Sequence, residues 1–168
     1  MKKLFQLSLL VFIFAGLAFA QTERPDWQNL ELTDAQTGES FTLASFEDKT
    51  VFVEPMATWC TNCRKQLNNV NSAIPEAGED VVFIALSVEG NLADDKLAEY
   101  ATRQEFDMMF AVATPELLTA LVEEFGRKIT SPPSTPHFII RPDGSTTELT
   151  TGIEAPEVLL AQIADAQN

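Results

Sequence analysis

Two cysteines, Cys60 and Cys63, are the residues of this sequence best suited to chemistry, and they are the only cysteines in its 168 residues. They stand between the apolar run 50–53 and a polar segment, 65–72, that is compatible with a helix. Their spacing puts both sulfur atoms on one face of a first helical turn, within reach of a disulfide. A bridge this short closes almost no loop and restrains the unfolded chain little. The spacing therefore favours a redox pair over a structural disulfide.

The position of the pair predicts a different role for each cysteine. A thiol at a helix N-terminus lies beside free backbone N–H groups and the positive end of the helix dipole, which stabilise the thiolate and lower the cysteine pKa. We therefore expect Cys60 to be the attacking sulfur. Cys63 lies one turn further along and is more covered, so we expect it to resolve a mixed disulfide by attacking Cys60.

Glu54 is a third candidate, because it stands six residues before Cys60 at the end of an apolar strand. Burial would raise the pKa of a carboxyl group there by desolvation, so that it could exchange protons near neutral pH. The alternative is a solvated or ion-paired glutamate at a strand end, and the residues alone leave both interpretations open.

The segment Val53-Glu54-Pro55-Met56-Ala57-Thr58-Trp59-Cys60-Thr61-Asn62-Cys63-Arg64-Lys65 resembles the active-site segment of the thioredoxin superfamily. It is most similar to the extracytoplasmic thiol–disulfide reductases of the TlpA/ResA type, and the likeness extends from about Asn29 to the C-terminus. Pro55 and Met56 depart from the bulky aromatic residues that are common there. The resemblance implies an α/β, thioredoxin-like fold, with a mixed central sheet flanked by helices and an N-terminal β-hairpin extension.

The same resemblance implies site residues beyond the cysteines. It makes Glu54 the acid/base for Cys63 and Trp59, Thr135 and Pro136 contacts for the substrate, and it implies no cofactor or metal besides the redox-active Cys60–Cys63 disulfide. Thr135-Pro136 is similar to the cis-proline loop of the superfamily, where the backbone of Thr135 could pair with an extended substrate segment. The alternative is an ordinary proline-rich connector.

The rest of the chain alternates strand and helix patterns, which predicts a mixed sheet with helices on both faces. Residues 81–88 have the pattern of a central parallel strand. The other predicted elements are two short strands around a turn at 36–38, the strand 49–53, helices at 94–106, 115–125 and 156–164, and strands at 109–112, 138–140 and 146–150.

The N-terminus has the pattern of a secretory signal. Lys2 and Lys3 precede an apolar run, 4–17, and Ala18-Phe19-Ala20 has the form of a cleavage site. We expect residues 1–20 to be the signal, 21–28 a flexible lead-in and 29–168 a single thioredoxin-like domain in the periplasm or another extracytoplasmic compartment. An uncleaved N-terminal anchor in the inner membrane is the alternative.

The charge of the chain excludes some partners. With 11 basic and 25 acidic residues, its net charge is −14, which argues against nucleic acids and anionic lipid surfaces. The expected partners are the disulfides and thiols of exported proteins and a membrane electron donor. The sequence does not predict an oligomeric state.

Three classes of function are compatible with these features, namely a thiol–disulfide oxidoreductase, a copper carrier and a binding module. The leading hypothesis is an exported protein-disulfide oxidoreductase, acting mainly as a reductase and, by resemblance, in cytochrome c maturation. A disulfide oxidant or isomerase is an alternative, as is a copper(I) carrier that uses Cys60, Cys63 and His137, the sole histidine. A binding module with an inert disulfide is the third class. His137 could also tune the sulfur atoms or have no part in the chemistry.

Overall fold

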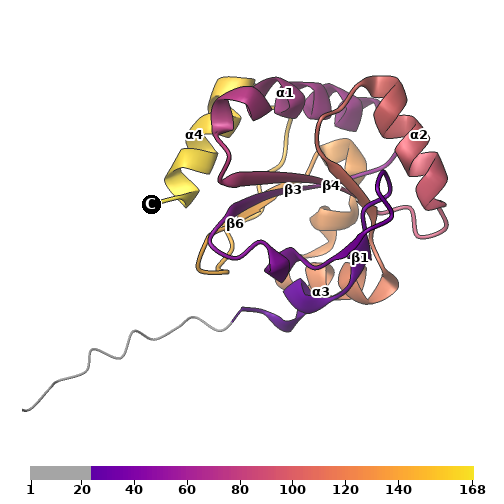
Figure 1. Ribbon diagram of the computed structural model, residues 1–168, viewed down its shortest axis with the longest axis horizontal. Coiled ribbons are helices and arrows are strands. Elements are labelled where there is room, and N and C mark those ends of the chain that lie inside the picture. Colours follow the sequence, from indigo (N-terminus) through magenta and orange to yellow (C-terminus); the bar gives the residue numbers. More distant parts are fainter. Residues whose placement is uncertain (1–23) are drawn as a thin grey trace, which may run out of the picture.

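The computed structural model describes residues 24–168, whose strands form a sheet with helices on both faces (Figure 1). The predicted signal at 1–20 lies outside the described residues. No helix within 24–168 has the length and apolar character needed to cross a membrane.

The centre of the domain is a four-stranded mixed sheet in the order β5-β4-β3-β6. β3 pairs in parallel with β4, β4 pairs in parallel with β5, and β6 runs antiparallel to β3. The strands are β3 (Thr50–Met56), β4 (Val81–Ser87), β5 (Met109–Val112) and β6 (Phe138–Ile140). β3 is buried at every position, as expected for an inner strand covered on both faces. The central parallel strand predicted at 81–88 is confirmed as β4, which lies between β3 and β5 and is parallel to both.

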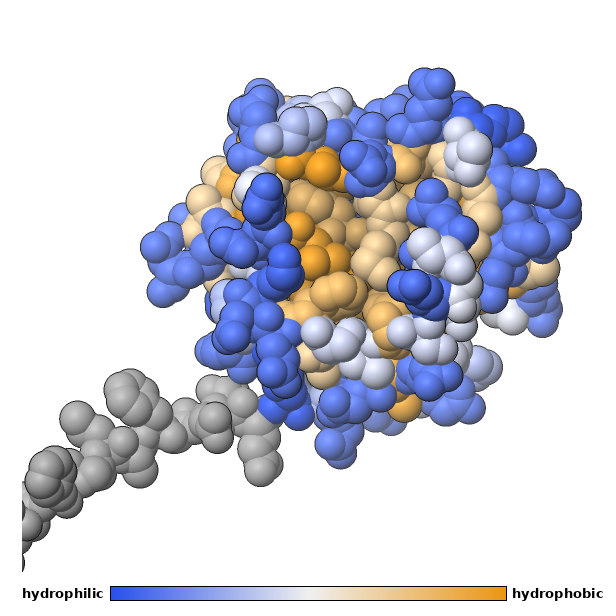
Figure 2. Space-filling view, in the orientation of Figure 1, coloured by the Kyte–Doolittle hydropathy of each residue, from blue (hydrophilic) through white to orange (hydrophobic). Residues whose placement is uncertain are grey.

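Four α-helices cover the sheet, with α1, α2 and α4 on one face and α3 on the other (Figure 1). They are α1 (Thr61–Ala77), α2 (Asp94–Gln104), α3 (Pro115–Phe125) and α4 (Pro156–Ala166). α3 begins as its sequence indicates, because the Thr114 side chain accepts the Leu117 N–H and Pro115 occupies the first position. Hydrophilic residues surround an apolar hollow on the face drawn in Figure 2.

Alternation along β3 decides which side chains face the cysteines. Phe52 and Met56 belong to the apolar cluster under α1, which also contains Cys60 and Cys63. Val51 and Val53 belong to the cluster on the α3 face. Since successive strand residues point to opposite faces, Glu54 projects to the same face as Phe52 and Met56.

The N-terminal hairpin is present, with β1 (Leu32–Thr33) paired antiparallel to β2 (Ser40–Phe41). The flexible lead-in predicted at 21–28 is wrong for its described part. Residues Asp26–Asn29 form a 3₁₀ turn in which Trp27 and Gln28 are buried. Gln28 Nε2 donates to the Gly144 carbonyl at 2.8 Å, which ties this turn to a distant one. The prediction failed because most of residues 21–28 are polar, whereas the one tryptophan among them, Trp27, packs into the apolar core.

The strand predicted at 146–150 is also wrong. This segment forms only isolated bridges, from Thr146 to Ile140 and from Thr150 to His137. The Ile139 N–H donates to the Thr147 side chain at 3.0 Å. In a regular β-ladder this N–H would donate to a backbone carbonyl, so the side chain replaces part of the backbone pairing.

Replacing Trp27 by Ala should lower the free energy of unfolding by about 3 kcal/mol, because a buried aromatic ring leaves a cavity. Trp27 packs edge-on against Phe125 and Phe138, with ring centroids 6.3 and 6.0 Å away. Urea denaturation measures the loss. The exposed Glu31→Ala is the control and should change stability by about 0.5 kcal/mol or less. Equal small effects would show that the turn at 26–29 does not stabilise the domain.

Candidate active site

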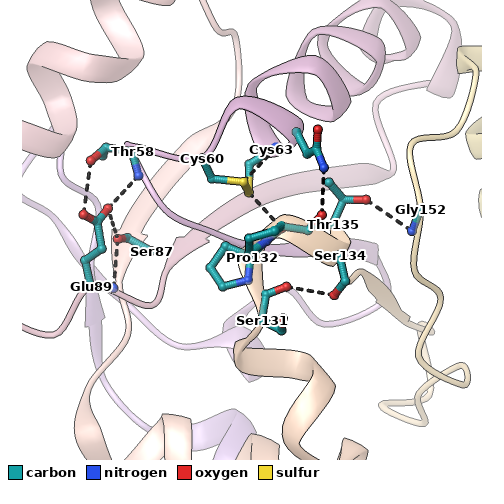
Figure 3. The surroundings of a disulfide bond; sticks show 12 residues. Thr58, Cys60, Cys63, Ser87, Glu89, Ser131, Pro132, Ser134, Thr135 and Gly152 are labelled. Carbon is teal, nitrogen blue, oxygen red and sulfur yellow. Dashed lines mark hydrogen bonds between the residues drawn. A yellow bond between two sulfur atoms is a disulfide. The ribbon is translucent and has the colours of Figure 1, made fainter.

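The candidate site is the Cys60–Cys63 disulfide at the N-terminus of α1 (Figure 3). Cys60 is the N-cap of the helix, and its Sγ accepts the backbone N–H of Cys63 at 3.0 Å. The two Cα atoms are 5.3 Å apart. The predicted proximity of the sulfur atoms is confirmed, and one of them receives a backbone N–H where the helix dipole is positive.

The two cysteines differ in their access to solvent. Cys60 keeps 3% of its surface exposed, whereas Cys63 has none. The preceding residue, Trp59, is 65% exposed and is one of the few large apolar side chains on the described surface. A partner that reached this disulfide would therefore meet Trp59 and the edge of Cys60 before Cys63.

The segment before β6 covers the buried sulfur. Cys63 Sγ lies 3.1 Å from the Pro132 carbonyl oxygen, and Asn62 Nδ2 donates to the Pro133 carbonyl at 3.0 Å. A sulfur in a disulfide carries no hydrogen, so the first approach is a contact in the oxidised protein. In the reduced protein the Cys63 thiol can donate to this carbonyl, which favours the protonated form of that cysteine.

The prediction of a cis peptide before Pro136 is wrong, because no peptide bond within residues 24–168 is cis. Thr135 instead turns the chain with a positive φ of 46°, and its N–H donates to the Pro132 carbonyl at 2.8 Å. Thr135 is 1% exposed, and Pro136 is buried too. Since the Thr135 N–H is already bonded, it is not free to pair with an added strand. Substrate contacts by Thr135, Pro136 and Trp59 remain predictions.

Glu54 is buried in the sheet, with 1% of its surface exposed. Neither carboxyl oxygen has a hydrogen-bond partner among residues 24–168, and desolvation raises the pKa of this carboxyl well above its ordinary value. Its neighbour on β4 is Ala85, whose side chain has no polar group that could bond to the carboxyl. A buried carboxyl group with a raised pKa is the environment predicted for an acid/base, but the role of Glu54 toward Cys63 remains a prediction.

Tyr100 on α2 is a second polar group near this carboxyl. Burial raises the pKa of the Tyr100 hydroxyl, the charge of Arg64 lowers it and the charge of Glu54 raises it. The hydroxyl is buried and has no hydrogen-bond partner in the described part of the chain, like both Glu54 oxygens. Glu54 and Tyr100 thus form a polar part of an otherwise apolar cluster beneath α1.

His137 is buried, and both of its ring nitrogens lie close to polar atoms of other residues. Its Nδ1 lies 3.4 Å from the Thr135 carbonyl oxygen, and its Nε2 lies 3.2 Å from both Gln162 Oε1 and Glu154 Oε2. The Glu154 approach is within ion-pair range but does not have hydrogen-bond geometry. The ring also stacks on Phe52. Copper binding with the cysteines would require His137 to leave these partners, and no cluster of three His, Cys, Asp or Glu able to hold a metal occurs within 24–168.

Two contacts of the site were missed from sequence. The proline carbonyl beside Cys63 belongs to Pro132, not to the segment around Pro136. Glu89, just beyond β4, accepts hydrogen bonds from Thr58 in the turn before Cys60. A useful signal was available for Glu89, because parallel strands end at the same edge of the sheet and place their following residues together.

Comparisons with known proteins agree with this geometry. No family model matches the chain. The thiol–disulfide oxidoreductase ResA of Oceanobacillus iheyensis is 26% identical over an alignment that covers 98% of this chain and 91% of the relative. A thiol:disulfide interchange protein of the thioredoxin family from Chlorobium tepidum has a similar structure, with a TM-score of 0.66, 21% identity and coverage of 83% and 93%.

DsbF of Mycobacterium tuberculosis, solved in mixed oxidised and reduced forms, gives a TM-score of 0.67 at 14% identity and covers 86% of this chain and 100% of that one. The structural matches establish the thioredoxin fold. The sequence match to ResA, which covers 98% of this chain, and the cysteine pair at disulfide distance indicate thiol–disulfide chemistry. The chain is similar in sequence to this thiol–disulfide oxidoreductase and has the thioredoxin fold. The predicted fold class and enzyme class are confirmed.

Replacing Glu54 by Gln should make the protein more stable at alkaline pH. A raised pKa means that the folded state holds a proton that the unfolded state has lost, so wild-type stability falls as pH rises above the ordinary glutamate value of about 4.3 and levels off above the raised pKa. Thermal unfolding should give a melting temperature for Glu54→Gln several degrees above wild type at pH 8, and a smaller difference at pH 4.

Glu76→Gln is the matched control, because Glu76 is exposed near the far end of α1. It should follow the wild-type pH dependence. If Glu54→Gln also followed wild type at every pH, the carboxyl group would not be held protonated by burial.

Proposed function

We propose that this chain is an exported reductase of protein disulfides. The observation that carries the proposal is the asymmetry of the pair, since Cys60 caps the helix and keeps residual exposure while Cys63 is fully buried. The similarity to ResA and the signal-like residues 1–20 support export, and the sequence resemblance favours net reduction and cytochrome c precursors among the clients.

In the proposed reaction the reduced protein acts first through Cys60. Its thiolate attacks one sulfur of a client disulfide, forming a mixed disulfide and releasing a client thiolate. The Cys63 thiolate then attacks Cys60 Sγ, which forms the Cys60–Cys63 disulfide and releases the second client thiolate. Two electrons pass to the client, and both client thiolates take up protons. An external dithiol, supplied by a membrane electron donor, reduces the pair again.

Glu54 has the proposed role of accepting the Cys63 proton before the second attack. Its burial and its unpartnered oxygens support this role, because a carboxyl with a raised pKa can exchange a proton near neutral pH. The Pro132 carbonyl favours the Cys63 thiol until then. Trp59 is the proposed apolar contact for the client, because it is exposed beside Cys60.

Substituting each cysteine by serine should distinguish the two roles. Cys60→Ser should abolish insulin reduction, because it removes the attacking sulfur. Cys63→Ser should also stop turnover but accumulate a mixed disulfide between Cys60 and the client, because nothing resolves it. Insulin turbidity and non-reducing mass spectrometry measure these outcomes. Equal trapping by both variants would contradict the assigned roles, and full activity of either would remove the redox mechanism.

The direction of the reaction can be read from the reduction potential of the pair. For a reductase we expect a value near that of thioredoxin, about −270 mV, when the protein is equilibrated with glutathione or dithiothreitol buffers. A value near about −120 mV, typical of a strong oxidant, would exclude the reducing role and favour the oxidant alternative. Tryptophan fluorescence and thiol alkylation give two independent readings of the reduced fraction.

A further inference from the structure

The Glu89 side chain accepts two hydrogen bonds from Thr58, in the turn that carries Cys60 (Figure 3). Its Oε2 accepts the backbone N–H of Thr58 at 2.6 Å, and its Oε1 accepts the Thr58 hydroxyl at 3.2 Å. Ser87 Oγ lies 3.5 Å from Oε2 and accepts the Glu89 N–H at 3.3 Å. The carboxylate therefore bridges the end of β4 and the turn that follows β3.

Few hydrogen bonds join the residues of this turn to one another. Only four residues separate the end of β3 at Met56 from the start of α1 at Thr61, and the Cys60 N–H closes them into a turn by donating to the Ala57 carbonyl at 3.0 Å. Thr58 is the central residue whose N–H points out of the turn to the carboxylate. Hydrogen bonds to a charged acceptor are short and comparatively strong, so this contact fixes the direction of the chain entering Trp59 and Cys60.

The carboxylate also adds a negative charge near the sulfur that must ionise. Thr58 is two residues from Cys60, and the helix dipole acts on Cys60 in the opposite sense. Other titratable groups reach the same region, namely Glu54 on β3, Arg64 on α1, and Tyr100 and Arg103 on α2. A test of Glu89 must leave all of them unchanged.

We propose that Glu89 is a positioning residue of the redox site, which holds the turn before Cys60 through the Thr58 amide and tempers formation of the Cys60 thiolate through its charge. The inference rests on the proposed redox function, for which Cys60 must be both accessible and ionised. A carboxylate used only as a structural cap would hold the turn without altering the chemistry of Cys60.

Glu89→Gln separates charge from anchoring, because an amide oxygen can still accept the Thr58 N–H. In the Cys63→Ser background, where Cys60 is the only thiol, the pH midpoint of its alkylation by iodoacetamide should fall by about half a unit or more. With both cysteines present, the equilibrium constant for reduction by glutathione should rise roughly threefold, because a more stable thiolate favours the reduced protein.

Glu89→Ala tests the anchoring. Removing the acceptor should accelerate hydrogen exchange of the Thr58 amide by about tenfold in the oxidised protein, whereas Glu89→Gln should change it much less. Glu76→Gln removes one charge at the far end of α1 and is the control for net charge, with no expected change in either measurement.

Equal alkylation midpoints for Glu89→Gln and Glu76→Gln, or an unchanged Thr58 exchange rate in Glu89→Ala, would overturn the proposal. Neither measurement needs a client disulfide. A wild-type protein that failed to reduce insulin would therefore count against the proposed function, while these two measurements would still decide the role of Glu89.

Discussion

The structure depends on one local constraint, which is that the first turn of α1 contains both sulfur atoms. The Cys63 N–H donates to Cys60 Sγ, so the group that caps the helix is also the group proposed to react. Capping stabilises the helix start and the same N–H favours negative charge on the sulfur. β3 ends at Met56, and the chain turns once before it reaches Cys60. Local stability and redox chemistry are satisfied by the same hydrogen bond.

Two segments distant in sequence contact the chain on either side of Cys60. Glu89, after β4, binds Thr58, and the Pro132 carbonyl, before β6, lies against Cys63. They differ in chemistry, since Glu89 is a carboxylate that contacts the turn before Cys60 and the Pro132 carbonyl is a neutral acceptor beside Cys63. The strands that flank β3 thus lead to separate contacts around the two sulfur atoms.

Burial of Glu54 is the clearest conflict between stability and chemistry in the domain. An unpartnered carboxyl group in an apolar cluster costs free energy when it ionises. Ala85 beside it and the unpartnered Tyr100 hydroxyl leave that cost uncompensated by hydrogen bonds within the described residues. Such an arrangement is expected where a proton must be held and released, which is the role proposed for Glu54.

The sequence by itself determined the helix start at Cys60, the buried parallel strand 81–88 and the cap at Thr114, because each depends on neighbours a few residues apart. It also indicated the cysteine pair, whereas it left the burial of Glu54 open. Only the tertiary structure decided that Trp27 and Glu54 are buried, that the Pro132 carbonyl lies beside Cys63, and that Glu89 accepts hydrogen bonds from Thr58. These contacts join residues far apart in the chain, and such contacts are set by sheet order and loop path, which local patterns do not encode.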